Sequence, residues 1–479
     1  MRATAIASLC ALAACGDELP VAPIALARTL APTLPALARA RAPGASDHVV
    51  IESRAARGGA LDAQITALGG RIERRVPELN MVVVKGLTAS GVASLSSRSD
   101  VTKLTQDVNL RWLPANTLRR ASAPAKASKK PPLPGIDQSG AFFFADWQWN
   151  MKVTKANQAW LTTPEGRGAK VYVLDTGIDP THADLLDRVD LARSTSFVES
   201  EIGDIKDYES HGTFVAAIIT SNGIGVASVA PAARIVAVKV LDATGSGSFA
   251  DLITGIVYAA NQGADVINMS LGAIVDASDP QTQQLLFHLQ AAIAYARLKG
   301  VTIVAASGND ALDLLALPPQ IISIPAEMAG VIAVGATAPV NQTNFDLITS
   351  YSNFGFNGFP IGGVPLVAPG GDLVQGGVLQ DLIISACSQF SPFGCGPLDY
   401  LIGAGTSFSS PMVAGEGAVL RSIVGNSLFG SFMTNNCILQ GVDQVGPSST
   451  YGRGRMNVVK AAACASRGGF GNHALIAQN

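Results

Sequence analysis

Five apolar, β-branched segments separated by helical stretches constrain the fold of this chain more than any other feature of its sequence. Continuous apolar strands between helices are typical of a parallel sheet that is buried on both faces, because each crossover connection lays a helix on the sheet. The sequence therefore predicts a doubly wound, mainly parallel α/β fold for residues 141–466. Its strands are expected at residues 169–174, 234–240, 265–269, 301–305 and 331–334.

The composition of the 479 residues fits a large globular chain. Hydrophobic residues make up 48% and charged residues 15%. A chain that is disordered throughout is excluded, since such chains are highly charged and poor in apolar residues. No apolar run approaches the length of about 18 residues that crosses a bilayer as a helix, so a polytopic membrane protein is excluded as well.

The two parts of the chain carry opposite charge. Residues 1–140 hold 18 Lys and Arg against 10 Asp and Glu, whereas the remainder holds 16 against 26, so a net charge of −2 hides +8 and −10. The basic residues are scattered among apolar segments and form no cluster that would indicate a nucleic-acid partner. We expect attraction between the two parts instead.

The first 15 residues have the pattern of an export signal. Met1 and Arg2 precede an uncharged stretch that ends in Leu-Ala-Ala-Cys at residues 12–15. This tetrapeptide resembles the bacterial lipobox, in which the cysteine becomes the lipid-modified first residue of the mature protein. Lipidation of Cys15 would be the chain's only link to a membrane. A plain secretory signal with a chance cysteine is the alternative.

Composition divides the rest of the chain into further units. An Ala- and Pro-rich tether at 16–46 precedes a small α+β domain at 47–113, where strand-like and helical patterns alternate. A basic, Pro-rich linker at 114–140 has no apolar pattern and is typical of the exposed segments that proteases cut. Residues 467–479 form a C-terminal tail after the large domain.

Four cysteines lie beyond the signal, in a chain that is expected to be exported. They allow three pairings, of which the closest-neighbour one joins Cys387 to Cys395 and Cys437 to Cys464. An oxidising compartment favours these two disulfides. Zinc is the competing interpretation, but no CxxC motif or Cys/His cluster supports it.

Four polar residues follow apolar segments of the large domain, where open α/β sheets place their ligands and catalytic groups. They are Asp175, His211, Asn309 and Ser407. Each has an ordinary structural explanation when it is taken alone: a turn, a buried histidine, a turn and a helix cap. Asp175-Thr176-Gly177 also matches the motif of pepsin-like aspartic proteases, but these need a second carboxylate and no second copy of the motif is present.

Together the four residues supply an orienting carboxylate, a general base, an amide donor and a nucleophile. The four residues occur in this order, with Gly177, Gly212, Gly405 and Pro411 beside them. In this respect residues 147–466 resemble the subtilisin-like serine proteases. The α/β-hydrolases would show G-x-S-x-G and a different order. The resemblance implies that Ser407 attacks the substrate carbonyl, His211 takes its proton, Asp175 orients His211, and Asn309 binds the oxyanion.

The resemblance also implies where substrates bind. Gly245-Ser246-Gly247 and Ser270-Leu271-Gly272 resemble the two segments between which a peptide adds as a strand; a Gly/Ser loop and a strand end are the ordinary alternatives. Ile324-Pro325-Ala326 resembles a wall of the pocket for the residue before the scissile bond. No charge lies nearby in the sequence, which favours an apolar or broad preference there.

Catalysis by these residues requires no cofactor, but the resemblance implies a structural calcium ion. Asp184 and Asn222 match side-chain ligand positions, and backbone carbonyls of Thr220, Ile224 and Val226 would complete the site. A loop without an ion is the alternative. The domain at 47–113 has the size of the family's propeptides, which assist folding and inhibit the enzyme until they are cut away.

The sequence thus predicts an exported serine endopeptidase that acts on proteins or peptides and is made as a zymogen. One alternative is a catalytically silent binding or scaffold lipoprotein on the same fold, against which the four intact residues argue. Another is a dedicated maturation protease or a peptide-ligating relative with the same residues, which sequence does not separate from a degradative enzyme.

Overall fold

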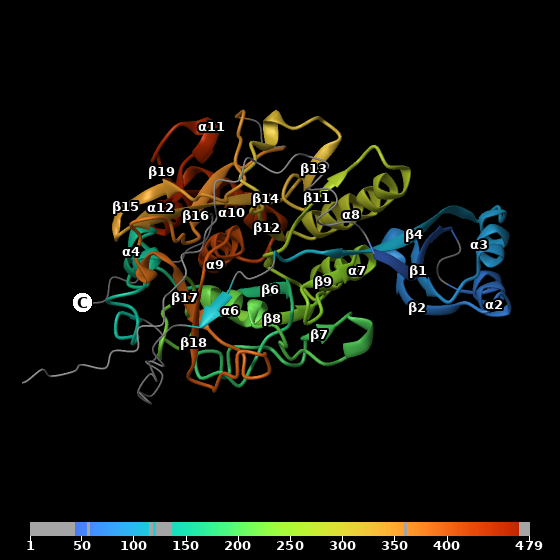
Figure 1. Cartoon of the computed structure of the whole chain (residues 1–479), viewed down its shortest axis with the longest axis horizontal. Helices are drawn as coiled ribbons and strands as arrows, with labels where there is room; N and C mark the ends of the chain where they lie inside the picture. Colours follow the sequence, from blue (N-terminus) through green and yellow to red (C-terminus); the bar gives the residue numbers. More distant parts are fainter. Residues whose placement is uncertain (1–43, 55–57, 115–117, 121–136, 359–361, 469–479) are drawn as a thin grey trace, which may run out of the picture.

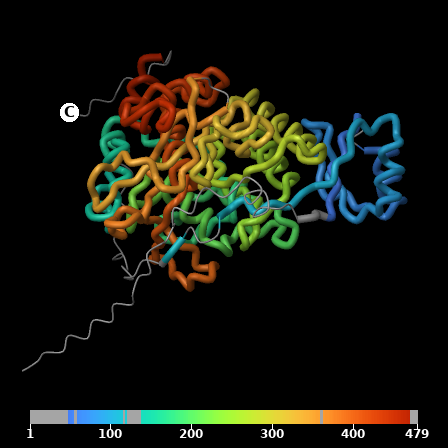
Figure 2. The backbone as a smooth tube through the Cα atoms, turned by 45° about the horizontal axis from the view of Figure 1, so that its top comes forward, coloured from blue at the N-terminus to red at the C-terminus, as the bar shows by residue number. Residues whose placement is uncertain are grey.

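The computed structural model describes residues 44–54, 58–114, 118–120, 137–358 and 362–468. A large domain occupies most of the molecule, and a small domain built from the N-terminal part projects from one end of it (Figure 1). A second direction of view shows the same division, with one strand of the small domain running on into the large domain (Figure 2).

The large domain is built on a ten-stranded, mainly parallel sheet. The five predicted strands are its centre and pair in parallel in the order β14-β12-β10-β6-β8, which confirms the predicted α/β fold. The strands, in their order across the sheet, are β19 (Val442–Asp443), β20 (Arg455–Met456), β16 (Leu366–Pro369), β14 (Ile332–Val340), β12 (Thr302–Ala306), β10 (Val266–Met269), β6 (Lys170–Asp175), β8 (Arg234–Lys239) and β7 (Thr195–Ser196), with β15 (Thr343–Ile348) paired to β14.

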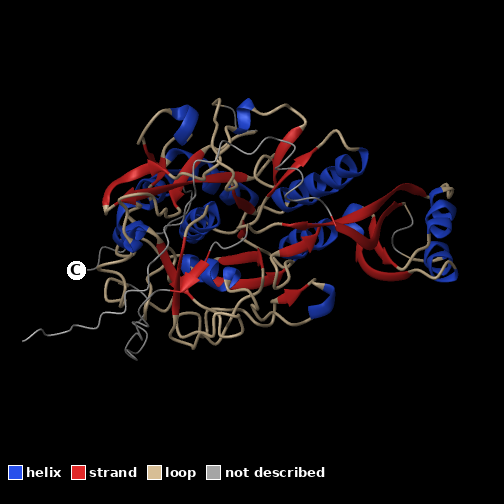
Figure 3. Cartoon of the chain, in the orientation of Figure 1, coloured by secondary structure: helices blue, strands red, loops and turns tan. Residues whose placement is uncertain are grey.

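Helices cover both faces of this sheet (Figure 3). Side chains along β6 alternate between two cores: Val171 and Val173 belong to one, and Tyr172 and Leu174 to the other. This alternation is the reason why the strand reads as continuously apolar. The first core is covered by α6 (His211–Ile219), α9 (Thr406–Val424), α10 (Leu428–Gln440) and α12 (Val458–Gly468), and the second by α7 (Phe249–Asn261) and α8 (Pro280–Leu298). Short helices are α4 (Trp149–Val153), α5 (Ala156–Ala159) and α11 (Ser448–Tyr451).

The small domain contributes four strands to a five-stranded antiparallel sheet, with two helices packed on it. The sheet order is β2-β3-β1-β4-β9, in which β9 (Ser246–Ser248) belongs to the large domain, and the core of the small domain contains Val49, Ile51, Ile65 and Leu95. β2 was not predicted from the sequence, because charged residues interrupt its apolar pattern. The elements are β1 (Gly44–Ser53), α2 (Ala60–Ala67), β2 (Arg71–Val76), β3 (Met81–Lys85), α3 (Ala89–Ser96) and β4 (Val101–Arg111).

Two smaller sheets and four 3₁₀ turns complete the described fold. In the first sheet β11 (Ala273–Asp276) pairs with β13 (Ile321–Ile324); the second has the order β17 (Ile383–Ala386), β18 (Tyr400–Gly403), β5 (Leu118–Arg120). The turns are η1 (Pro77–Leu79), η2 (Glu199–Glu201), η3 (Leu314–Ala316) and η4 (Leu379–Asp381). The structure contains both disulfides of the closest-neighbour pairing, with Cα–Cα distances of 6.1 Å for Cys387–Cys395 and 5.5 Å for Cys437–Cys464.

Several predicted segments lie outside the described residues. They are the signal with Cys15, the tether up to residue 43, most of the linker at 114–140, and the tail from residue 469. Within the described part of the chain, every helix is too short or too polar to cross a membrane.

Candidate active site

The four candidate residues lie at the edge of the sheet where its parallel strands end. Asp175 is the last residue of β6, and Asn309 follows β12 after a two-residue turn. His211 is the first residue of α6, and Ser407 lies in the first turn of α9. Each side chain is therefore held by the end of a regular element, as expected for a site in an open α/β sheet.

Asp175 and His211 form a buried pair. His211 Nδ1 lies 2.8 Å from Asp175 Oδ1, and both side chains are fully buried. A carboxylate accepts only, so Nδ1 carries the proton and donates it to Asp175. His211 Nε2, which is also buried and has no partner among the described residues, is then the acceptor of the neutral ring.

Close backbone contact brings these two side chains together. A Cβ atom at Gly212 would lie 2.1 Å from the Gly177 carbonyl oxygen and 3.2 Å from Asp175 Cβ, so only glycine fits beside His211. Asp207 ties the same two segments: its carboxylate accepts hydrogen bonds from Thr176 Oγ1 (2.8 Å) and from Thr213 N (2.8 Å). The start of α6 is thus fixed against the end of β6.

Charges around His211 favour its protonated form. Burial alone would lower the pKa of His211, but the Asp175 carboxylate and its hydrogen bond, together with Glu209 and Asp207, raise the pKa above its usual value. Burial also raises the pKa of Glu209 to about 7, against an opposing effect of His211. Glu209 Oε2 accepts a hydrogen bond of 2.7 Å from His211 N.

Ser407 belongs to the segment that contacts His211 through Phe408, and it is 2% exposed. Its hydroxyl donates to the Ser270 carbonyl oxygen over 3.1 Å, so in this structure it is turned toward the end of β10. The next residue, Phe408, packs its ring against the ring of His211 with 5.8 Å between the centroids. A rotation about χ1 of Ser407 is therefore the motion that would direct its hydroxyl to another acceptor.

Asn309 and Ser407 direct two N–H groups at one small space. Asn309 Oδ1 accepts from Thr406 N (2.9 Å) and Thr406 Oγ1 (2.8 Å), which fixes the amide and leaves Nδ2 as its donor end. Ser407 N lies in the first turn of α9, where backbone N–H groups have no partner within the helix. A Cβ atom at Gly405 would lie 3.4 Å from Asn309 Nδ2 and 3.7 Å from Ser407 N. The space that Gly405 leaves open can hold an anionic oxygen between both donors.

Both predicted substrate segments are hydrogen-bonded to a strand of this same chain, at and just after the end of β4. β9 (Ser246–Ser248) pairs antiparallel with the end of β4, with Leu110 opposite Gly247. Trp112 N donates to the Gly245 carbonyl (2.9 Å), and Gly272 N donates to the Trp112 carbonyl (3.2 Å). The Ile324 carbonyl of the predicted pocket wall borders Gly272, where a Cβ atom would come within 3.3 Å of it.

The chain forms a second strand pair with the strand that precedes Ser407 in the sequence. β5 pairs antiparallel with β18, with Leu118 opposite Gly403 and Arg120 opposite Leu401. β18 ends four residues before Ser407. Residues 109–113 are thus paired with the predicted substrate segments, and residues 118–120 with the strand that precedes Ser407. β5 was not predicted, because residues 114–140 show no apolar pattern.

Asp184 and Asn222 do not have the arrangement of calcium ligands. Asp184 accepts hydrogen bonds from N–H and O–H groups only, and Asn222 Oδ1 accepts from Arg188 Nε (2.7 Å). The two carboxylate oxygens of Asp184 already accept five hydrogen bonds, and the charged Arg188 guanidinium lies at Asn222 Oδ1. These residues therefore do not fit a calcium ion, which needs several accessible oxygen ligands. The sequence showed the residue types at suitable positions but not the direction of the backbone N–H groups.

Two further residues shape the site and were not found in the sequence. Asp207 fixes the start of α6, and its only signal was an acidic residue four positions before a helix that begins with His211. Thr406 fixes Asn309, and its signal was a hydroxyl residue directly before Ser407. Both act through contacts between segments that are distant in the sequence.

Known proteins are similar to this chain over the region that contains the four candidate residues. A model of the subtilase family (peptidase S8) matches residues 166–447, which include all four. The chain belongs to the subtilase family. This subtilase is 35% identical over 323 residues to the thermophilic serine proteinase of Bacillus sp. (strain AK1), covering 67% of this chain and 68% of that protein. It is 32% identical over 323 residues to thermitase from Thermoactinomyces vulgaris, covering 67% and 97%.

A solved structure has the same fold. The epidermin leader peptide processing serine protease from Staphylococcus aureus superposes with a TM-score of 0.67 at 22% identity, covering 88% of this subtilase and 99% of that chain. With the family match and the curated relatives, this subtilase is a serine-type endopeptidase, whose substrates are proteins or peptides.

Proposed function

We propose that Ser407 is the nucleophile of this endopeptidase and that His211 is its general base. The observation that carries the proposal is the buried Asp175–His211 pair: with Nδ1 donating to Asp175, Nε2 is the acceptor of the neutral ring, and no described residue occupies it. Ser407 Oγ attacks the substrate carbonyl carbon while its proton passes to His211 Nε2. The negative charge that develops on the carbonyl oxygen is stabilised by Asn309 Nδ2 and Ser407 N.

The second half of the reaction uses the same groups. His211 returns the proton to the leaving amine as the C–N bond breaks, and an ester of Ser407 remains. A water molecule then attacks this ester and gives a proton to His211, which passes it to Ser407 Oγ as the ester C–O bond breaks. The carboxylic acid product leaves, and the free hydroxyl of Ser407 is restored. Asp175 stabilises the imidazolium that forms twice in the cycle, in agreement with its effect on the pKa of His211.

We propose further that the small domain keeps this site closed as a propeptide. Trp112, which follows β4, is 1% exposed and packs edge-on against Phe249 of the large domain, with 5.4 Å between the ring centroids. Its Nε1 donates to the Gly247 carbonyl over 2.9 Å. A substrate strand needs the same carbonyl and the same edge of β9, so the two compete for one place.

Opposite charges join the two domains beside β9. Arg74 of β2 forms an ion pair with Asp251 near the start of α7, and both side chains are largely buried. At the edge of the small domain Lys85 pairs with Glu199 and lies 3.1 Å from Asp47. These contacts give a structural basis for the attraction expected from the charges of the two parts.

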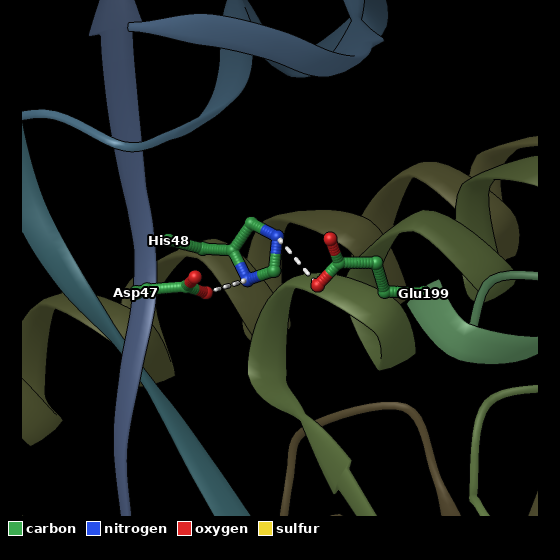
Figure 4. A group of neighbouring side chains, drawn as sticks. All are labelled: Asp47, His48 and Glu199. Carbon is green, nitrogen blue, oxygen red and sulfur yellow. Dashed lines mark ion pairs between the residues drawn. The ribbon is translucent and has the colours of Figure 1, made fainter.

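His48 joins the same cluster of side chains. Its ring lies between Asp47 (3.5 Å) and Glu199 (3.9 Å), as Figure 4 shows. These three are the group of metal-ligand residue types in the described part of the chain. Because the ammonium group of Lys85 already pairs with both carboxylates, we interpret the cluster as an interface ion pair and not as a metal site.

The same arrangement supports cleavage of the chain by its own active site. Leu113 N donates to the Gly245 carbonyl of a predicted substrate segment, and Leu118 pairs with Gly403, four residues before Ser407. The peptide bonds from Leu113 to Leu118 connect these two points, and residues 115–117 lie outside the described residues. We propose that one of these bonds is cut to separate the propeptide from the enzyme.

We also propose that the enzyme is exported, with a lipid on Cys15 as its membrane link before processing. The two disulfides support an oxidising compartment. Cys15 precedes the proposed cut, so processing would leave the lipid on the propeptide and release the large domain. Labelling of the full chain with a fatty-acid analogue that is lost in Cys15→Ala would test the lipid.

Processing is tested by following the full chain after refolding. We expect a new N-terminus between residues 113 and 118, at a first-order rate that does not depend on protein concentration. The Ser407→Ala chain is expected to stay intact on its own. When active enzyme is added, we expect this chain to be cut outside residues 113–118 or not at all. A first cut in the wild type outside residues 113–118, or an unchanged cut in Ser407→Ala, would refute self-processing at this site.

A further inference from the structure

A hydrogen-bond network fills the place where the sequence suggested calcium. The carboxylate of Asp184, which is fully buried, accepts hydrogen bonds from five groups. They are Ser221 Oγ (2.8 Å) and Ile224 N (2.7 Å) at Oδ1, and Gly225 N (2.9 Å), Val226 N (3.1 Å) and Tyr400 Oη (2.7 Å) at Oδ2.

Donors on all sides of Asp184 are incompatible with a cation there. Calcium takes about six to eight oxygen ligands, and a loop that binds it turns its carbonyl oxygens inward. Here three consecutive backbone N–H groups of the loop point inward instead, with their partial positive charge toward Asp184. The other predicted ligand, Asn222, donates from Nδ2 to the Ala183 and Leu186 carbonyls, and its Oδ1 is paired with Arg188.

The ring of Tyr400 packs directly against the loop that holds this network. A Cβ atom at Gly225 would lie 2.0 Å from Tyr400 Cζ, so the tyrosine ring takes the space beside the loop. Its ring also packs against Phe143 and His182, with centroids 5.1 Å and 5.2 Å away. Burial first, and then the charge of Asp184, raise the pKa of Tyr400, so its hydroxyl stays protonated and remains a donor.

The network joins three segments that carry the catalytic candidates. Asp184 lies nine residues after Asp175, and the loop of residues 221–226 directly follows α6, which begins with His211. Tyr400 begins β18, seven residues before Ser407. The carboxylate of Asp184 thus links all three segments, as a bound ion in its place would do.

We propose that Asp184, Ser221 and Tyr400 replace a structural calcium ion at this loop, and that the loop is stable without any metal. The folded chain is then insensitive to calcium here, and removal of either partner of the Asp184–Tyr400 hydrogen bond loosens the loop in a way that calcium does not repair. This inference concerns stability, so it stands whether or not the proposed self-processing occurs.

Thermal unfolding of the full chain tests the proposal, in a Ser407→Ala background that prevents self-digestion. Each variant is melted in excess EDTA and in excess calcium chloride. We expect the same Tm for the parent in both buffers, and a Tm for Tyr400→Phe that is lower by at least about 3 °C in both. Tyr295→Phe is the control, because its hydroxyl makes one exposed hydrogen bond, to Asn261, and should change Tm little.

Variants of the loop show whether any effect of calcium on Tm arises from an ion at this loop. A rise of Tm with calcium that is lost in Asp184→Asn or in Asn222→Ala would show an ion at this loop and overturn the proposal. Asn222→Ala keeps the test decisive if Asp184→Asn does not fold. A calcium effect that both variants retain arises elsewhere and agrees with the proposal, whereas an unchanged Tm for Tyr400→Phe would refute the role of Tyr400.

Discussion

Replacement of Trp112 by alanine should weaken inhibition by the propeptide more than any other single change in the strand that enters the active site. A tryptophan side chain buries about 200 Å², and at about 25 cal/mol per Å² its complete burial stabilises the complex by up to about 5 kcal/mol. Part of that area is already shielded from water in the free propeptide. We therefore expect the replacement to cost about 3 kcal/mol of binding free energy, which includes the loss of the hydrogen bond to Gly247. This corresponds to an inhibition constant that is about 100-fold weaker.

The assay mixes the processed enzyme with propeptide that is produced separately, and measures the inhibition constant by hydrolysis of a chromogenic peptide. Trp112 contacts the large domain rather than the core of the propeptide, so Trp112→Ala should leave the propeptide as folded as the wild type. Arg111→Ala is the matched control: Arg111 is exposed and its pairing with Ser246 uses the backbone, so inhibition should change less than about fivefold. An inhibition constant for Trp112→Ala within about threefold of the wild-type value would refute the proposed docking.

Three further predictions concern the catalytic residues. Asn309→Ala should lower kcat by about 100- to 1,000-fold with little change in KM, because it removes one oxyanion donor; an equal loss through KM would contradict this role. Gly212→Ala should abolish folding or activity, since its Cβ would meet the Gly177 carbonyl at 2.1 Å, whereas Gly396→Ala, with 3.7 Å to its nearest atom, should be tolerated in a melting experiment. The pH profile of kcat/KM should fall on the acid side through a pKa above 6.5, because the base form of His211 is needed and Asp175 raises that pKa; an acid limb below 6.5 would contradict the pairing.

The sequence predicted the parts of the fold that depend on local pattern. The strands β6, β8, β10, β12 and β14 were found because burial on both faces makes them continuously apolar. By contrast β2 was missed, since its charged residues pair with Asp62 and with the large domain, which no local pattern shows. β5 was missed because a three-residue strand is specified by its partner β18 rather than by its own side chains.

The candidate site could be predicted as a set of residues but not as an arrangement. Glycine, small residues and chain order identified Asp175, His211, Asn309 and Ser407. That the serine hydroxyl donates to the Ser270 carbonyl depends on the conformation of one side chain, which no motif encodes. The calcium prediction has the same limit: the residue type of Asp184 suits the ion, but the direction of three backbone N–H groups, which the sequence does not show, decides whether Asp184 can bind a cation.

The most direct test of the account is reaction of the chain with a fluorophosphonate probe, followed by peptide mass spectrometry, with the processing state recorded in each sample. We predict that Ser407 is labelled, that labelling appears only after cleavage between residues 113 and 118, and that it is absent in Ser407→Ala. A processed and folded chain that takes up no label at Ser407 would contradict the account.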